Sequence, residues 1–458
     1  KTVSVTSANL QIVFTDSDGA LTETDIEPGW SATKTFTIKN DTKTEYKYNI
    51  VIKDLVNTFV TNGYLQYKIT STNNGYNMTE FKDIPKSSAP KDTILAYSVV
   101  IPNGVTQSYT IEFKYTNDES VDQSEDMGKK LSGTLFITEG TEDIYAGYEE
   151  GTLGYQIMGD NPTRSTRSNN NNGTNDFATP LTTTTTGTLF TSTESITGIT
   201  DSPKEVYYYA GNTTNNWVKF AGLYWRIIRT NHDGSIRLLY VGTSHDTTTG
   251  NIEESEFNTN INSPKYVGYK YGEDTSYDTI RNNTTDSTIK TFIDSWYQNN
   301  LTNYSKYLST SAVYCNDRSE GTGQTYSASA GFNFASYYRM DYDTDGASAN
   351  PSYNCTDIRD AFSIDNTNAK LDYPVSLMTA DEIAFAGGVA FQTMNTPYAW
   401  FISNSVGTQV STSWWSLSPN NWNNGNANVW NWNSDNANLN NNNVDNTNAV
   451  RPANFSRV

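Results

Sequence analysis

The chain has 458 residues, of which 13% are aromatic and 18% charged, and its 31 basic and 50 acidic residues give a net charge of −19. The aromatic content excludes wholesale disorder, and the acidic balance disfavours a protein that neutralises nucleic-acid phosphates, since the longest basic run is Lys129-Lys130. Two histidines, His232 and His245, provide little for acid–base catalysis or zinc binding, and no apolar run approaches the ~18 residues of a membrane span.

The first 140 residues read as short strands in which apolar and polar residues alternate. The alternation is clear in residues 10–14, 48–52 and 109–115, and turn dipeptides such as Asn62-Gly63 separate the runs. About seven strands of this kind predict an all-β immunoglobulin-like sandwich over residues 1–140, although the Cys…Trp…Cys pattern of antibody domains is missing. We expect this domain to act as a stalk.

Residues 141–205 read as a linker that becomes the lead-in segment of a second domain. Residues 152–158 can form a short helix, and residues 164–175 are of low complexity. The threonine run at 182–186 is either coil or an edge strand, because threonine favours strands.

From about residue 206 the pattern changes to a mixture of strands and helices. Strand-like runs lie at 206–210, 217–228 and 236–241. Residues 288–308 have apolar side chains at helical spacing, and a second helix is expected over 379–386, where Thr379 and Glu382 have the spacing of a capping box. These elements predict an α+β domain over residues 206–458.

The two cysteines of the chain, Cys315 and Cys355, lie in this second domain. They either close a disulfide loop of roughly 40 residues, which would stabilise the fold by roughly 4 kcal/mol, or remain two buried thiols. The polar, lysine-poor composition favours an extracellular protein, in which a disulfide persists.

Between these cysteines, Asp341, Asp343 and Asp345 match the first half of a calcium loop, in which alternate carboxylates converge on the ion. The glutamate expected at the twelfth position is replaced by Ser352, so the motif is either a weak Ca²⁺ site or a solvated turn. No other metal or cofactor is expected.

Asparagine dominates the segment from Asn420 to Asn448, where it accounts for 16 of 29 residues. A disordered asparagine tract is one reading. Against it, residues 426–433 largely alternate between polar and apolar residues, as a strand with one buried face would, and ordered-looking sequence stands on both sides.

Four stretches carry a resemblance to a known family: NNWVKFAGLYWRIIRTNHDGSIRLLY, YPVSLMTADEIAFAGG, WWSLSP and the closing AVRP. Their order resembles that of bacterial surface proteins with a C-type-lectin-like (formylglycine-generating-enzyme-like) fold. The asparagine segment resembles the variable region of a diversity-generating retroelement, in which a reverse transcriptase miswrites adenines, so that asparagine codons become many other codons but never a stop. The resemblance covers roughly residues 153–458 and implies that Cys315 and Cys355 form a disulfide.

The resemblance implies a hypervariable binding surface on a rigid scaffold. Trp414, Trp415, Gly425 and Arg451 would belong to the scaffold, the asparagines would face solvent, and Trp422 with either Trp430 or Trp432 would be partly exposed. The expected ligand-binding positions of the variable region, residues 420–448, are Asn420, Asn421, Trp422, Asn423, Asn424, Asn426, Asn428, Trp430, Asn431, Trp432, Asn433, Asn436, Asn438, Asn440, Asn441, Asn442, Asn443, Asn446 and Asn448.

The sequence therefore predicts a non-enzymatic, extracellular protein of the bacterial cell surface that binds a protein or glycan on another cell or phage. A membrane anchor upstream of Lys1 is one way to hold it there, and nucleic acid is not an expected partner. The alternatives are a phage receptor-binding protein on the virion, a pilin-like structural protein and a formylglycine-generating-type enzyme, which would need free thiols at its two cysteines.

Overall fold

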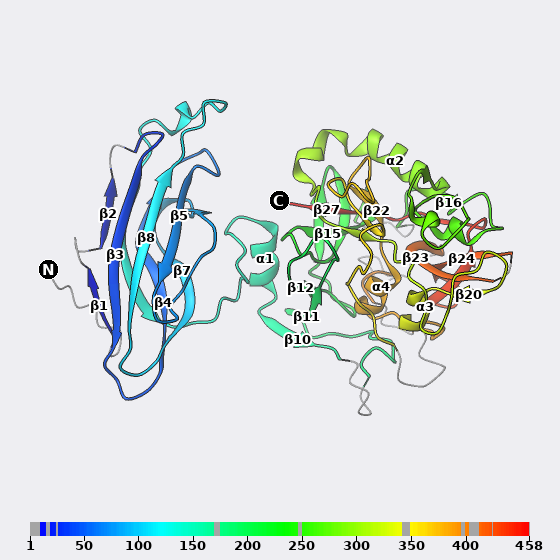
Figure 1. Cartoon of the computed structure of the whole chain (residues 1–458), viewed down its shortest axis with the longest axis horizontal. Coiled ribbons are helices and arrows are strands. Elements are labelled where there is room, and N and C mark those ends of the chain that lie inside the picture. Colours follow the sequence, from blue (N-terminus) through cyan, green and yellow to red (C-terminus); the bar gives the residue numbers. More distant parts are fainter. Residues whose placement is uncertain are drawn as a thin grey trace. The chain divides into compact units, whose positions relative to one another are not determined.

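The computed structural model describes residues 10–14, 19–23, 26–168, 175–245, 250–340, 349–394, 399–402, 412–423 and 425–457. The chain divides into two compact units, residues 1–150 and 151–458, which are treated separately below (Figure 1).

The first unit contains two antiparallel sheets. One has the strand order β1-β3-β8-β5-β6 and the other β2-β9-β4-β7. The strands are β1 (Leu10–Phe14), β2 (Ala20–Glu23), β3 (Ser31–Asn40), β4 (Tyr46–Asn57), β5 (Leu65–Ser71), β6 (Lys82–Asp83), β7 (Ser87–Ile101), β8 (Thr106–Tyr115) and β9 (Leu131–Glu139), with a short 3₁₀ turn, η1 (Ser124–Asp126).

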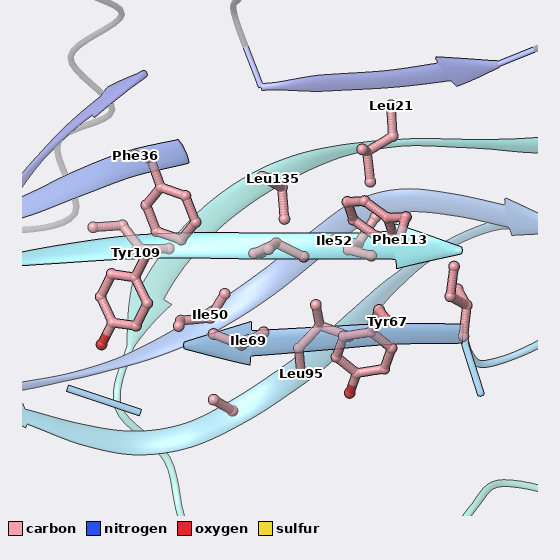
Figure 2. Close-up of a cluster of buried hydrophobic side chains, with 14 of the residues drawn as sticks. Leu21, Phe36, Ile50, Ile52, Tyr67, Ile69, Leu95, Tyr109, Phe113 and Leu135 are labelled. Atoms are coloured by element: carbon pink, nitrogen blue, oxygen red, sulfur yellow. The ribbon is translucent and has the colours of Figure 1, made fainter. Parts of the chain in front are cut away.

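The two sheets enclose one apolar core, because every second side chain of the strands points inward (Figure 2). Phe36 of β3 stacks on Tyr109 of β8 with ring centroids 5.0 Å apart. The buried Tyr48 hydroxyl satisfies its hydrogen bonding by donating to Gln107 Oε1 at 2.6 Å. The expectation of a β-rich first domain is confirmed. Strands β2 and β6 were not predicted because they are short, whereas β5 was missed although it alternates and follows the Asn62-Gly63 turn.

The second unit contains four helices among the residues that the structure describes: α1 (Leu153–Asp160), α2 (Thr288–Asn300), α3 (Ala335–Met340) and α4 (Ala380–Ala386). Its 3₁₀ turns are η2 (Pro264–Val267), η3 (Thr279–Arg281) and η4 (Thr302–Tyr307). The predicted capping box of α4 is confirmed, since Thr379 Oγ1 accepts from the Glu382 N–H and Glu382 Oε2 accepts from the Thr379 N–H.

A large sheet forms one side of this unit. Its order is β10-β11-β12-β14-β15-β27-β22, with β13 paired to β14. The strands are β10 (Thr163–Thr166), β11 (Thr188–Glu194), β12 (Lys204–Tyr208), β13 (Trp217–Phe220), β14 (Leu223–Thr230), β15 (Ile236–Gly242), β22 (Val375–Leu377) and β27 (Pro452–Ser456).

This sheet corrects two sequence predictions. Strands β10 and β11, within the predicted linker and lead-in segment of residues 141–205, pair in the large sheet, so the second unit begins at Gly151 and not at residue 206. The predicted strand over 217–228 is a hairpin, in which Ala221 and Gly222 both take positive φ angles (55° and 76°) as a tight two-residue turn requires. Ala-Gly is a weaker turn signal than Asn-Gly, so the sequence did not show it.

The second sheet carries the asparagine-rich segment, and its order is β16-β26-β23-β24-β25 with β20 paired to β23. Its strands are β16 (Glu254–Glu256), β20 (Phe332–Asn333), β23 (Trp414–Trp422), β24 (Ala427–Asn433), β25 (Asn438–Asn443) and β26 (Thr447–Ala449). Two small pairs, β17 (Lys270–Tyr271) with β18 (Thr285–Asp286) and β19 (Tyr314–Cys315) with β21 (Ala361–Phe362), complete the unit.

Candidate functional site

The asparagine-rich segment is an ordered three-stranded antiparallel ribbon within the second sheet. Strand β24 pairs with β23 on one side and with β25 on the other. Asn428 lies opposite both Asn421 and Asn443, so the turn between β23 and β24 and the end of β25 lie at the same end of the ribbon. The turn between β24 and β25 lies at the other end.

Both faces of this ribbon are covered. On the tryptophan face, which carries Trp430 and Trp432, the Trp432 ring packs edge-on against Phe401 with centroids 5.0 Å apart. On the valine face, which carries Val429 and Asn431, Trp415 packs against Phe257 at 5.8 Å. The prediction of one buried and one solvent-facing side is therefore wrong, because other segments of the unit pack against each face.

This burial corrects the predicted positions of many variable side chains. Five asparagines are buried: Asn420, Asn428, Asn431, Asn438 and Asn448. Trp422, Trp430 and Trp432 are buried as well, so none of them is partly exposed as predicted. The half-buried asparagines are Asn421, Asn433, Asn440, Asn441, Asn442 and Asn443, the exposed ones are Asn423, Asn426, Asn436 and Asn446, and Asn424 lies outside the described residues.

Several buried polar groups of the ribbon lack a hydrogen-bond partner among the described residues. They are the indole N–H groups of Trp414, Trp422, Trp430 and Trp432, the Oδ1 atoms of Asn431 and Asn438, and the Nδ2 groups of Asn420 and Asn448. An unpaired buried amide or indole group costs free energy, since it gives up hydrogen bonds to water without replacement. These positions stabilise the fold less than apolar residues of the same shape would.

The exposed asparagines lie at turns. In the turn between β23 and β24, the Asn423 N–H donates to the Asn426 carbonyl (3.0 Å), and the buried Asn428 amide donates to Asn421 Oδ1 (2.7 Å). Gly425 has φ +116° with open space around it, so this position needs glycine for its backbone conformation and not for lack of room.

Strand β25 is the last strand of the ribbon, and its own asparagines cap its outer edge. The N–H groups of Asn441 and Asn443 donate to the side-chain oxygens of Asn440 (2.8 Å) and Asn442 (3.0 Å) rather than to another strand of the described part of the chain. Such capping blunts an edge that would otherwise pair with another strand.

Two aromatic side chains outside the variable segment lie beside the tryptophan face. The ring centroids of Tyr337 on α3 and Phe391 lie 6.4 Å and 5.8 Å from that of Trp430. Neither residue was predicted from the sequence, because neither stands in a motif. The succession Gly387-Gly388 followed by apolar residues was the only local signal of an irregular segment there.

The predicted disulfide is confirmed, since Cys315 and Cys355 are bonded and their Cα atoms lie 5.8 Å apart. The calcium candidates Asp341, Asp343 and Asp345 lie outside the described residues. Scaffold residues Trp414 and Trp415 are fully buried, as predicted.

Among the described residues, one set of three aspartates has carboxylate oxygens close enough together to hold a metal ion: Asp286, Asp294 and Asp372. The Lys290 ammonium lies among them, at 3.0, 2.5 and 2.8 Å from their respective oxygens, so an amino group already holds the position of a cation. Burial raises the pKa of Asp294 to about 6, while Lys290 opposes the shift. The cluster joins the start of α2 to the segment before β22.

A buried ion network links β11, β14 and α4. Arg229 lies 2.9 Å from both Glu194 and Glu382, and His232 Nδ1 lies 3.1 Å from Glu194. Burial alone would raise the pKa of Glu194, but the charges and hydrogen bonds of Arg229 and His232 together outweigh burial and bring this pKa to about 2. The network lines a small cavity of about 20 Å³, room for about one water molecule. Its carboxylates are engaged by arginines, which suits a structural role.

Comparisons with known protein families, with curated proteins and with solved structures returned no match to this chain. Among the helices that the structure describes, none has the length and apolar character needed to cross a membrane.

Proposed function

We propose that the chain is a non-catalytic, hypervariable ligand-binding protein of the bacterial cell surface. In this proposal residues 1–150 form an immunoglobulin-like stalk and residues 151–458 a C-type-lectin-like tip, which retroelement mutagenesis at adenines diversifies. The ligand is a protein or glycan on another cell or phage.

One observation carries the proposal: asparagines saturate a ribbon whose ends are exposed and whose middle is buried. Asn423, Asn426, Asn436 and Asn446 lie at turns, where side chains can change at little cost to folding, while Val429, Leu439 and Val444 are fully buried. Asparagine has no structural reason to fill both kinds of position, because four of the five buried asparagines, Asn420, Asn431, Asn438 and Asn448, each have an amide atom without a partner among the described residues. A mutational mechanism that starts from asparagine codons accounts for both.

The bonded pair Cys315 and Cys355 supports the extracellular part of the proposal, because disulfides persist in oxidising compartments. The neutral-polar composition has the same implication.

The proposal is tested by sequencing this gene and its flanking DNA in many isolates. We expect a near-identical repeat beside a reverse-transcriptase gene, with differences confined to adenines. Charged residues should occur at positions 423, 426, 436 and 446 and be rare at the buried positions 420, 428, 431, 438 and 448, since a buried unpaired charge destabilises the fold. Substitutions spread evenly over all three codon bases, without such a repeat, would refute the proposal.

A further inference from the structure

Phe391 is an exposed aromatic residue in an unusual backbone conformation. Its side chain is 44% exposed, more than that of any other large hydrophobic residue among the described part of residues 151–458. Its φ angle is +59°, in the left-handed region that bulky residues rarely adopt. Neither the exposure nor the conformation favours phenylalanine for folding, so a function is the better explanation of its presence.

The backbone at this position is held firmly against the variable ribbon. The Phe391 N–H donates to the Leu439 carbonyl of β25 (2.9 Å), and the Leu439 N–H donates to Val389 (3.3 Å). The Phe391 ring lies 5.8 Å from that of Trp430, which is fully buried beneath it. The ring is thus presented at a fixed place beside the ribbon.

Two half-buried asparagines of the variable segment, Asn441 and Asn443, lie on the same face of the ribbon as Trp430, and the Asn441 amide donates to the buried Asn420 Oδ1 (3.1 Å). Asn441 lies opposite Trp430 across the β24–β25 pair, and Asn443 lies opposite Asn428. An apolar centre with a polar rim is the usual anatomy of a protein–protein contact, in which a few aromatic residues contribute most of the affinity. The spread of these groups over three chain segments suits a protein surface better than a single sugar ring.

We propose that Phe391 is a fixed apolar anchor of the ligand-binding surface. It contacts every protein partner, and the residues at the neighbouring asparagine positions determine which partner binds. This inference rests on the proposed function and names the class of partner. Because Phe391 lies outside the variable segment, its contribution persists through every diversified copy.

Two display libraries of the full chain test the proposal. Both randomise positions 423, 426, 441 and 443; one keeps Phe391 and the other carries Phe391→Ser. Each is panned against immobilised streptavidin as the protein probe and against mannan as the glycan probe. We expect streptavidin-binding clones mainly from the first library, and Phe391→Ser in those clones should weaken binding at least about tenfold.

Controls separate binding from folding. Phe391→Ser should leave the melting temperature of each clone unchanged or raised, Phe391→Trp should keep the affinity, and Tyr307→Ser, at a residue that is 38% exposed elsewhere on this unit, should change affinity less than about twofold. Binders that keep their affinity after Phe391→Ser would overturn the proposal and leave the proposed function standing. Phe391-dependent clones on mannan alone would overturn the protein assignment, and folded libraries without any binder would overturn both proposals.

Discussion

Replacing single asparagines of the ribbon by aspartate separates buried from exposed positions without changing side-chain size. Asn431 is 2% exposed and Asn438 is 5% exposed, and the Oδ1 atom of each has no partner among the described residues. Asn423 and Asn426 are exposed at a turn of the same ribbon. The four substitutions are isosteric, so any difference between the two pairs comes from the burial of the new charge.

The structure sets the size of the expected effect. No arginine or lysine is paired with Asn431 or Asn438 in the described residues, so a carboxylate there would be buried without a counter-charge. A buried charge without its partner lowers the free energy of unfolding by about 3–5 kcal/mol. A rise of about 3 units in the pKa of the introduced aspartate limits this loss at neutral pH to about 4 kcal/mol, because the carboxyl then binds a proton. Surface substitutions stay within about 0.5 kcal/mol.

Thermal unfolding followed by tryptophan fluorescence measures this difference in the full chain. The signal reports mainly the second unit, because Trp30 is the only one of the ten tryptophans outside it. We expect Asn431→Asp and Asn438→Asp to lower the melting temperature by roughly 6–15 °C at pH 7, and Asn423→Asp and Asn426→Asp to leave it within about 2 °C. The loss should shrink at about pH 4.5, where a carboxyl with a raised pKa binds a proton.

Equal melting temperatures for all four variants would show that the ribbon interior is open to solvent or that it rearranges, and the division into buried and exposed positions would be wrong. A large loss at all four positions would show that the turn asparagines are structural, and the proposed binding surface would then be unable to vary.

Three further predictions concern the rest of the molecule. Cys315→Ser combined with Cys355→Ser should destabilise the second unit by about 4 kcal/mol, measured by urea unfolding, whereas reactive thiols in the native protein would contradict the bonded pair. The pKa of Asp294 is raised to about 6, so the native state binds a proton more strongly than the unfolded state, and this group's contribution to stability falls as the pH rises from 4 to 6. Asp294→Asn should therefore gain stability relative to the native chain over that range, by up to about 3 kcal/mol, and a pH-independent difference would refute the assigned burial. Cleavage by a glutamate-specific protease should occur early at the exposed Glu150 and release a folded fragment that begins at Gly151; a first cut within residues 151–205 would show that this region is not part of the second unit.

Local patterns in the sequence predicted the elements whose burial follows a single period. Strand β8 alternates strictly from Gln107 to Tyr115, and α4 begins and ends at residues with strong capping chemistry, Thr379 and Gly387. Strands β10 and β11 could not be found in the same way, because their largely polar residues carry no alternation. Pairing with the rest of the large sheet makes them ordered.

The asparagine-rich segment forms strands, as its alternation predicts, but many of its side chains are more deeply buried than predicted. The prediction that asparagines face solvent rested on the family resemblance and on the polar–apolar alternation, and tertiary packing overrides such a pattern where segments from elsewhere cover a strand. Phe257 covers the valine face and Phe401 the tryptophan face, and nothing in the sequence of the ribbon indicates either contact. Phe391 was missed for the same reason, since it approaches Trp430 only in the folded chain.

Under the proposed function, substitutions in a ribbon covered on both faces affect folding at its buried positions and binding at its exposed positions. A mutation of Asn431 changes the core. An apolar residue there removes an unpaired amide, whereas a charged residue lowers the stability of the fold. A mutation that reaches Asn423 or Asn426 meets solvent and leaves the fold intact. Asparagine is uncharged and small enough to be tolerated at both kinds of position, although it is optimal at neither. Under the proposed function, this sequence is therefore a tolerant starting point, from which substitutions in the interior adjust stability and substitutions at the turns adjust the binding surface.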